Sequence, residues 1–333
     1  MVGKRRRFRF RIAILKICAS VALLLPWLFV HASAQETAAP APASAHPSST
    51  VVTGVTITAP RYSGASVPDP VLRAFVRSRS VPAQIGQLAR WRREVCPRTV
   101  GLPQKFDDYI DKRIKEVAAK VGAPTKLSGS CLMNIVIVFT PEPQRLLDDV
   151  RNNNAPVFGF HYPAQLRRIT TFKHAIQAWY TTATRGDHGQ VGVNMSHGGV
   201  WLDDPRSSMP SGLLGSRLST GLASEFAGVL IVADWNKVSD RSIGSVADYI
   251  ALLALSDTPV TDACGEMPSI TDLLASACNA DPAPDALTSA DLAYLNALYA
   301  TNLKDVMSEE QNEIVDRMQQ RMTGKSPDRA GAQ

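Results

Sequence analysis

Four of the six histidines and two of the aspartates are the candidate side chains for hydrolysis or metal binding. They are His161, His174, His188, His197, Asp234 and Asp248. Imidazoles and carboxylates bind zinc and transfer protons, so a cluster of them would form a catalytic site. Successive histidines stand 13, 14 and 9 residues apart, so no two share a face of one helix. We therefore expect neither a metal nor a cofactor, and the four histidines remain candidate metal ligands only if loops bring them together.

Asp234 and Asp248 flank a turn between an apolar strand and an apolar helix. If both carboxylates point into one cleft, they form an acid–base pair, although aspartates also occur at strand ends and helix starts for structural reasons. His197 lies in the segment Met195–Gly199, whose His-Gly-Gly sequence is of a kind found near oxyanion holes. No GxSxG motif supplies a nucleophile, and a hairpin turn explains the glycines better. We expect no catalytic residue and keep Asp234, Asp248 and His197 as the candidates for a hydrolase.

The cysteines indicate disulfide bonds more than a metal site. Of the five cysteines, Cys18 lies in an N-terminal segment that we expect to be removed, which leaves four. Four cysteines in an exported chain suggest two disulfides, in any of three pairings. We favour Cys96–Cys131 and Cys264–Cys278 because each pair brackets one local structural unit. The alternative, zinc, lacks the closely spaced cysteine pair that such sites use.

The N-terminus has the pattern of a secretory signal peptide over residues 1–34. A basic start precedes the apolar run Ile17–Val30, and Ala32 and Ala34 place small residues at −3 and −1 before Gln35. The alternative is a retained membrane anchor, but 14 residues that include a proline span a bilayer poorly. We expect cleavage after Ala34, and a periplasmic or secreted protein with no stable transmembrane segment.

The charge balance excludes a nucleic-acid partner. Of the 36 Lys and Arg residues, seven lie in the first 16 positions, which leaves 29 against 30 acidic residues in the rest of the chain. The sequence pI of about 9.1 therefore comes from the leader, and the expected mature chain carries no basic excess. Lys4–Phe8 resembles a twin-arginine motif, so export by either the Sec or the twin-arginine route is open.

Beyond the leader we expect three segments. Residues 35–66 form an Ala/Pro/Ser-rich linker that lacks the apolar side chains needed to offset ordering entropy. Within it, Val51–Ala59 is a short extended stretch that resembles the TonB-contacting box of outer-membrane receptors, although no series of barrel strands follows. Residues 67–322 form a single globular domain, and residues 323–333 form a flexible tail.

Hydrophobic periodicity predicts an α+β domain. Helical content starts near Val71 and runs through the basic stretch Arg73–Arg93, and residues 151–168 have the composition of a long loop. Capping boxes at Thr288 and Ser308 start the last two helices. We expect strands at 95–102, 132–140, 176–184, 190–202 and 227–238 (the last ending in a turn), and helices at 103–121, 143–150, 243–255, 289–299 and 309–322.

This order of elements resembles that of the zincins, metallopeptidases of the matrixin kind. In that family a late helix carries HExxH, and a Pro-Ser-Ile-type segment and a final helix with a Leu-Tyr ending follow it. Here Pro268–Ile270 and Leu287–Tyr299 follow the helix at 243–255. The resemblance covers about 95–300 and implies a zincin-like mixed sheet with a long N-terminal helix, a late helix packed on it and C-terminal helices.

The zinc-binding residues of the family are absent from the late helix. Where HExxH would lie, the chain reads Asp248-Tyr249-Ile250-Ala251-Leu252, with no histidine pair and no general-base glutamate. The resemblance therefore implies a metal-free relative of a metallopeptidase.

The chain also looks like uncharacterised exported proteins of alphaproteobacteria, which imply no activity. The corresponding pieces are 92–101, 134–140, 247–256 and 287–299.

Two functions follow from these observations. The first is a non-catalytic exported protein that binds a peptide, an envelope protein or a glycan, because a zincin sheet presents its edge strand to an extended peptide. Trp179 and Tyr180 beside Gln177, together with Trp201 and Trp235, would line such a groove, although aromatics on strands are more often core residues. The alternative is an envelope hydrolase that uses the loop histidines and Asp234/Asp248.

Overall fold

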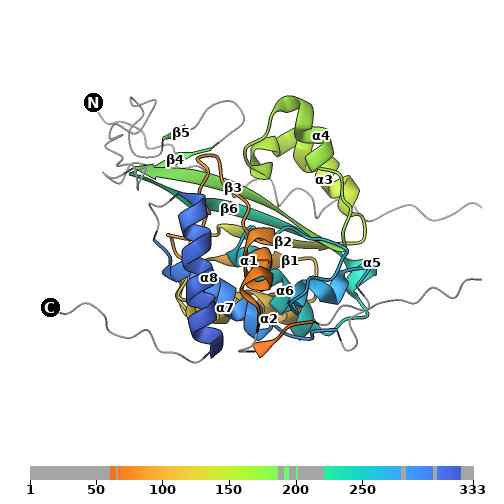
Figure 1. Cartoon of the computed structure of the whole chain (residues 1–333). Coiled ribbons are helices and arrows are strands. Elements are labelled where there is room, and N and C mark those ends of the chain that lie inside the picture. Colours follow the sequence, from red (N-terminus) through yellow and green to blue (C-terminus); the bar gives the residue numbers. More distant parts are fainter. Residues whose placement is uncertain are drawn as a thin grey trace, which may run out of the picture. The chain divides into compact units, whose positions relative to one another are not determined.

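One mixed sheet with helices on both faces forms the domain (Figure 1). The computed structural model describes residues 61–64, 67–186, 191–194, 200–201, 221–278, 283–302 and 306–323. The predicted signal peptide, the Val51–Ala59 segment and the tail beyond Thr323 lie outside these residues. The predicted combination of helices with a mixed sheet is confirmed. None of the described helices is both long and apolar enough to cross a membrane.

The sheet has six strands among the described residues, in the order β1-β2-β6-β3-β4-β5. They are β1 (Pro97–Val100), β2 (Ile135–Thr140), β3 (Ile176–Gly186), β4 (Val191–Val193), β5 (Val200–Trp201) and β6 (Leu222–Asp234). Strands β1, β2 and β6 are parallel, and β3 runs antiparallel to both β6 and β4. Strand β6 begins earlier than residue 227 because it pairs with β3 as far back as Leu222.

Alternating side chains of the central strands enter two different cores. On β2, Ile135 and Ile137 are fully buried among the helices of one face, whereas Val136 and Val138 pack against the other face. This period of two is what a strand buried on both sides requires, and it explains the nearly continuous apolar run of β2.

The helices divide between the two faces of the sheet. The described α-helices are α1 (Asp69–Ser78), α2 (Gln104–Val121), α3 (Pro143–Asn154), α4 (Leu166–Ile169), α5 (Trp235–Val238), α6 (Ile243–Leu255), α7 (Ser289–Ala300) and α8 (Met307–Thr323). Short 3-10 helices also occur: η3 (Ala155–Phe158), η4 (Pro163–Gln165) and η5 (Ile270–Leu274). Helices α1, α2, α6, α7 and α8 share the larger core, and α3, η3 and α4 cover the opposite face. The Thr288 capping box of α7 is confirmed.

Three predictions about the helices were wrong. The helix from residue 71 ends at Ser78, because Pro82 follows and the chain then runs extended to pair with β6 at Arg90. The expected loop at 151–168 contains the end of α3 as well as η3, η4 and part of α4. Helix α8 begins at Met307, so Ser308 is inside it and does not cap it.

Both predicted disulfides are confirmed. Cys96–Cys131 and Cys264–Cys278 have Cα–Cα separations of 5.8 Å and 4.8 Å, within the range of such bonds. The first ties the chain before β2 to the start of β1. The second closes a loop of 14 residues that also holds the N-terminal segment, because Tyr62 donates its backbone N–H to the carbonyl of Glu266.

A buried ion pair fixes the C-terminal helices on the domain. Arg90 Nη2 lies 2.5 Å from Glu310 Oε1, and both side chains are almost fully buried. Arg90 also donates to the carbonyls of Leu298 and Thr301 at the end of α7. The second oxygen of Glu310 accepts the N–H of Leu88 at 2.8 Å. One arginine therefore joins α7 and α8 to the segment that pairs with β6.

Replacing Glu310 by alanine should destabilise the domain strongly, because Arg90 would keep a buried charge without its partner. We expect Glu310→Ala to lower the free energy of unfolding by about 3–5 kcal/mol. Urea unfolding with the disulfides intact measures this change. The matched control is Glu309→Ala on the exposed face of α8, with an expected change within about 0.5 kcal/mol. Equal effects of the two substitutions would contradict the role of the pair.

Candidate functional site

The buried C-terminus of α6 organises the candidate site. Residues 245–255 of this helix are buried, so its last carbonyls need donors from the protein. Trp91 Nε1 donates to the carbonyl of Ala254 at 2.7 Å, and the hydroxyl of Tyr299 donates to that of Leu255 at 2.8 Å. The hydroxyl of Tyr180, on β3, reaches the carbonyl of Leu253 at 2.9 Å. Three aromatic side chains from separate elements thus fix where the chain leaves α6.

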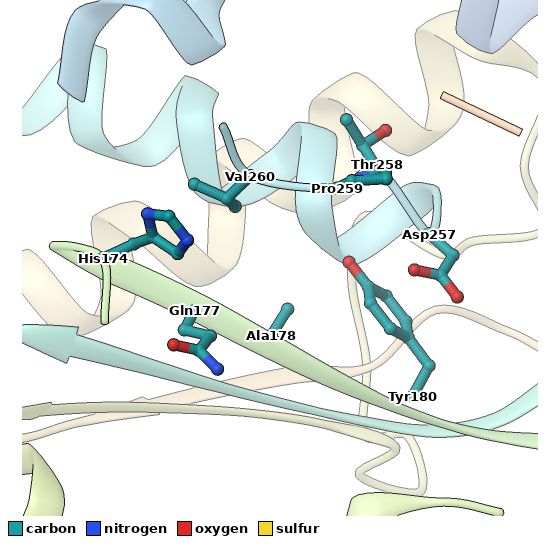
Figure 2. Close-up of a pocket in the computed structure, with 8 residues that line it drawn as sticks. All are labelled: His174, Gln177, Ala178, Tyr180, Asp257, Thr258, Pro259 and Val260. Atoms are coloured by element: carbon teal, nitrogen blue, oxygen red, sulfur yellow. The ribbon is translucent and has the colours of Figure 1, made fainter. Parts of the chain in front are cut away.

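A pocket lies between this exit and β3. It has a volume of about 220 Å³ and is lined by His174, Gln177, Ala178, Tyr180, Asp257, Thr258, Pro259 and Val260. Figure 2 shows Asp257 beside the ring of Tyr180 at one end and His174 at the other. We call it the Asp257 pocket.

Asp257 is the pocket residue whose charge is not compensated. None of the residues that the structure describes forms a hydrogen bond or an ion pair with its carboxylate. Burial raises the pKa of Asp257 to about 7, because the ionised form loses hydration and no partner replaces it. A carboxyl group in this state fits a ligand-binding or proton-transfer site better than a structural one.

The other polar groups of the pocket are mostly engaged by the protein. His174 Nδ1 lies 3.6 Å from a carboxylate oxygen of Asp262. The side-chain oxygen of Gln177 accepts the N–H of Lys173, and the hydroxyl of Thr258 lies 2.8 Å from that of Ser256. The pocket therefore offers one available charge against apolar and aromatic walls.

Near Ala178, β3 has an accessible edge next to the pocket. The carbonyl of Ala175 accepts the N–H of Asp234 at 2.9 Å, so odd-numbered residues here direct their backbone groups toward β6. Ile176 and Ala178 consequently direct theirs away from β6, and no described residue forms a hydrogen bond with them. Ile176 is fully buried, so Ala178 is the accessible position of the two. Strand β4 covers this edge only from Ala183 onward.

A glycine marks where the open edge ends. Gly159 has a φ of +79°, and a Cβ there would collide with the carbonyl oxygen of Tyr180. Only glycine permits this approach and this backbone conformation. The accessible edge of β3 is therefore limited to the stretch around Ala178, between the buried Ile176 and Trp179.

Both aspartates of the predicted acid–base pair, Asp234 and Asp248, are bound by groups of the protein itself. Asp248 receives the guanidinium of Arg113, with Nε 2.5 Å from Oδ1 and Nη2 3.1 Å from Oδ2, and also accepts the N–H of Leu287. Asp234 accepts the N–H of Asn236 at 3.0 Å and caps the start of α5. These contacts fasten α6 to α2 and end β6.

The histidine candidates do not assemble within the described residues. His161 is buried, with Nδ1 2.8 Å from the carbonyl oxygen of Gly159. His174 lines the Asp257 pocket. His188 and His197 lie outside the described residues.

Metal-binding residue types come together at one place in the described part of the chain. Cys264, Asp272 and Cys278 have ligand atoms within 4.8 Å of one another. The two cysteines form a disulfide, and Asp272 pairs with Arg61. This group is therefore a structural junction.

The predicted aromatic groove is present only in part. Trp179 is 5% exposed and belongs to the core, which is the other interpretation that the sequence allowed for aromatic residues on strands. Trp235, by contrast, is 43% exposed just after β6. Tyr180 and Gln177 line the Asp257 pocket, and the side chain of Trp201 lies outside the described part of the chain.

Comparison of the chain with family models, with curated proteins and with solved structures gives no match. The fold and the site therefore define the protein only as a class: a disulfide-bonded domain whose mixed sheet has helices on both faces and an acidic pocket beside an accessible stretch of β3.

Asp257 is the site residue that sequence reasoning missed. A weak signal was present, because Asp257 directly follows a helix without charge beyond Asp248 and precedes Pro259, which stops further helix. Nothing in the sequence indicates that the neighbouring donors would all bind α6 carbonyls and leave this carboxylate alone.

Asp257→Asn should stabilise the protein at alkaline pH. Because folding raises the pKa of Asp257, the folded protein holds this proton more tightly than the unfolded chain does. The resulting stabilisation is complete below about pH 4 and is lost as the pH rises through about 7. The variant cannot ionise, so its melting temperature should exceed that of the wild type by a few degrees at pH 8, with the difference disappearing near pH 4. Thermal unfolding followed by circular dichroism measures both.

Asp240→Asn is the matched control, because Asp240 is exposed and pairs only with Arg241 at 3.5 Å among the described residues. Its melting temperature should stay close to that of the wild type at pH 8, because an exposed ion pair contributes little stability. A pH-independent difference for Asp257→Asn would contradict the raised pKa.

Proposed function

We propose that this chain is an exported, non-catalytic protein that binds an extended peptide, or an extended strand of an envelope protein, along the open edge of β3. The observation that carries the proposal is the outward-facing backbone of Ala178, which is partly exposed beside the Asp257 pocket and has no partner among the described residues. Natural proteins cover or interrupt exposed strand edges, so an open one beside a pocket fits a binding site.

Peptide fits this edge better than glycan. The edge offers an alternating series of N–H and C=O groups at the spacing of another strand, which a peptide backbone matches at every second residue. The side chains that a sugar ring would need for stacking are less favourably placed, since Trp179 is buried in the core.

Export is supported by the cysteines and the N-terminal sequence. Both disulfides have ordinary separations, and such bonds persist in oxidising compartments. We propose that residues 1–34 are the signal peptide and that cleavage follows Ala34.

The absence of catalysis rests on α6, which we propose is the late helix of a degenerate metallopeptidase-like scaffold. Asp248 is held by Arg113, and Tyr249 and Leu252 are almost fully buried in the core. None of these positions supplies an imidazole or a free carboxylate to a zinc ion.

Residues 35–333 should contain well below one equivalent of zinc. The protein for this measurement is exported with its disulfides formed and purified without chelators or a histidine tag, and metal is measured by mass spectrometry. One tightly held metal per chain would contradict a metal-free protein, and would make His161, His174, His188 and His197 the first residues to replace.

Strand pairing predicts a period of two in the peptide. A positional-scanning library of acetylated, amidated hexapeptides supplies the probe, and each amide of the best binder is then N-methylated in turn. Methylation of alternate amides should weaken binding at least about fivefold, since each removes a hydrogen bond worth about 1 kcal/mol, and the amides between them should tolerate it. Fluorescence anisotropy measures the affinities.

Two variants test the same pairing from the protein side. Ala178→Pro removes an outward N–H at an edge position where proline is tolerated, and should abolish binding. Ala178→Ser keeps the N–H and should bind normally. The proposal fails if no library peptide binds, or if the effect of N-methylation does not alternate.

A further inference from the structure

The Asp257 pocket lies on the side of the sheet where every second side chain of a bound strand would project. Ile176, Ala178 and Tyr180 share one face of β3: Ile176 is part of the core that contains α6, and the other two pack against it. Residues opposite each other on paired strands direct their side chains to the same face. The peptide residue opposite Ala178 would therefore direct its side chain to the face on which Ala178 and Tyr180 line the pocket.

We propose that the Asp257 pocket binds the cationic side chain, lysine or arginine, of the peptide residue that pairs opposite Ala178. This inference rests on the proposed strand pairing and specifies the side chain that the site selects. The cation pairs with the uncompensated carboxylate of Asp257, and its aliphatic stem lies against Ala178 and Val260.

The surroundings of Asp257 favour a positive charge for a second reason. Asp257 directly follows Ser256, the C-cap of α6, so it lies at the negative end of the helix dipole. A cation is stabilised at that end, whereas the carboxylate alone is not. The ring of Tyr180 beside it adds an aromatic face, which also attracts cations.

The size of the pocket fits one side chain. Its volume of about 220 Å³ is below the roughly 300–1,000 Å³ of pockets that hold drug-sized ligands. It is also several times larger than the roughly 30 Å³ that one water occupies in the liquid. A single long side chain, contributed by a strand held on the neighbouring edge, matches this volume.

The charged and titratable groups near Asp257 are few. His174 lines the far end of the pocket and pairs with Asp262, and the hydroxyls of Tyr180 and Tyr294 interact electrostatically with Asp257. Burial holds the pKa values of both tyrosines above their usual range, so they stay neutral. Asp257 and His174 are therefore the pocket residues to replace when the pH dependence of binding is assigned.

The test compares two hexapeptides that differ only at the position opposite Ala178. One carries lysine there, and the other carries norleucine, which has a similar hydrocarbon stem without the ammonium group. At pH 8 the lysine peptide should bind at least about tenfold more tightly, because a charge-assisted contact replaces lost hydration. An arginine peptide should show a similar preference, and a glutamate peptide should bind more weakly than norleucine.

The preference should fall as the pH decreases. With a carboxyl pKa of about 7 in the free protein, the ionised fraction of Asp257 falls about 30-fold between pH 8 and pH 5.5 while lysine stays protonated, so the affinity for the lysine peptide should fall to about that of the norleucine peptide. Binding below pH 7 should therefore release a proton, which calorimetry in buffers of different ionisation enthalpy detects.

Two variants assign the effect to one group. Asp257→Asn should bind the lysine and norleucine peptides equally and lose the pH dependence of the ratio. His174→Gln should keep both the preference and most of its pH dependence. An unchanged lysine preference in Asp257→Asn, or a ratio that does not vary with pH, overturns the proposal.

The outcomes also separate this inference from the proposed function. If N-methylation alternates but lysine and norleucine bind equally, strand pairing stands and the cation pocket is wrong. If no peptide binds, strand pairing is wrong, and n-butylammonium, followed by the ¹³C shift of the Asp257 carboxyl, tests the pocket by itself. No shift at millimolar amine overturns the cation pocket as well.

Discussion

The structure depends on the need to satisfy the last carbonyls of a buried helix. Helix α6 has almost no polar side chain of its own, and its C-terminus lies inside the larger core, where water cannot supply donors. Trp91, Tyr180 and Tyr299 provide the N–H and O–H groups. Because each comes from a different part of the chain, these hydrogen bonds fix the relative positions of β3, α6 and α7. The Asp257 pocket is a consequence, since it lies between β3 and the exit of α6.

The segment around Arg90 links the position of α6 to the positions of α7 and α8. Trp91 binds α6, while the neighbouring Arg90 binds Glu310 on α8 and the carbonyls at the end of α7. A buried charge pair adds little net stability compared with apolar packing, yet removal of one partner is costly. The pair therefore acts mainly by making other arrangements of α7 and α8 unfavourable. The extended conformation of this segment has the same origin, because a helix here would remove Arg90 from β6 and from α8 together.

The function proposed for the site uses two features that the rest of the structure leaves unsatisfied. One is the outward-facing backbone of Ala178, and the other is the carboxylate of Asp257. The first is unusual, because folded proteins pair most backbone groups and cover their strand edges. Asp248 shows the contrast: it was a candidate for chemistry in the sequence, but Arg113 and the backbone of Leu287 bind it completely. A carboxylate with so many partners stabilises the fold, whereas one without partners is free for a ligand.

Local patterns in the sequence determined the elements whose signals are short-range. Apolar periodicity predicted α2 and α6, the run of apolar residues predicted β2, and the Thr288 capping box predicted the start of α7. Both disulfide pairings were favoured because each pair brackets one local structural unit. Tertiary structure decided the features that depend on contacts between distant residues. The early start of β6 requires pairing with β3, and the start of α8 two residues before its expected position accompanies the contact of Glu310 with Arg90. The free state of Asp257 belongs to the same group, because a side chain is left without a partner only after every neighbouring donor has been used elsewhere, and no local pattern records that competition.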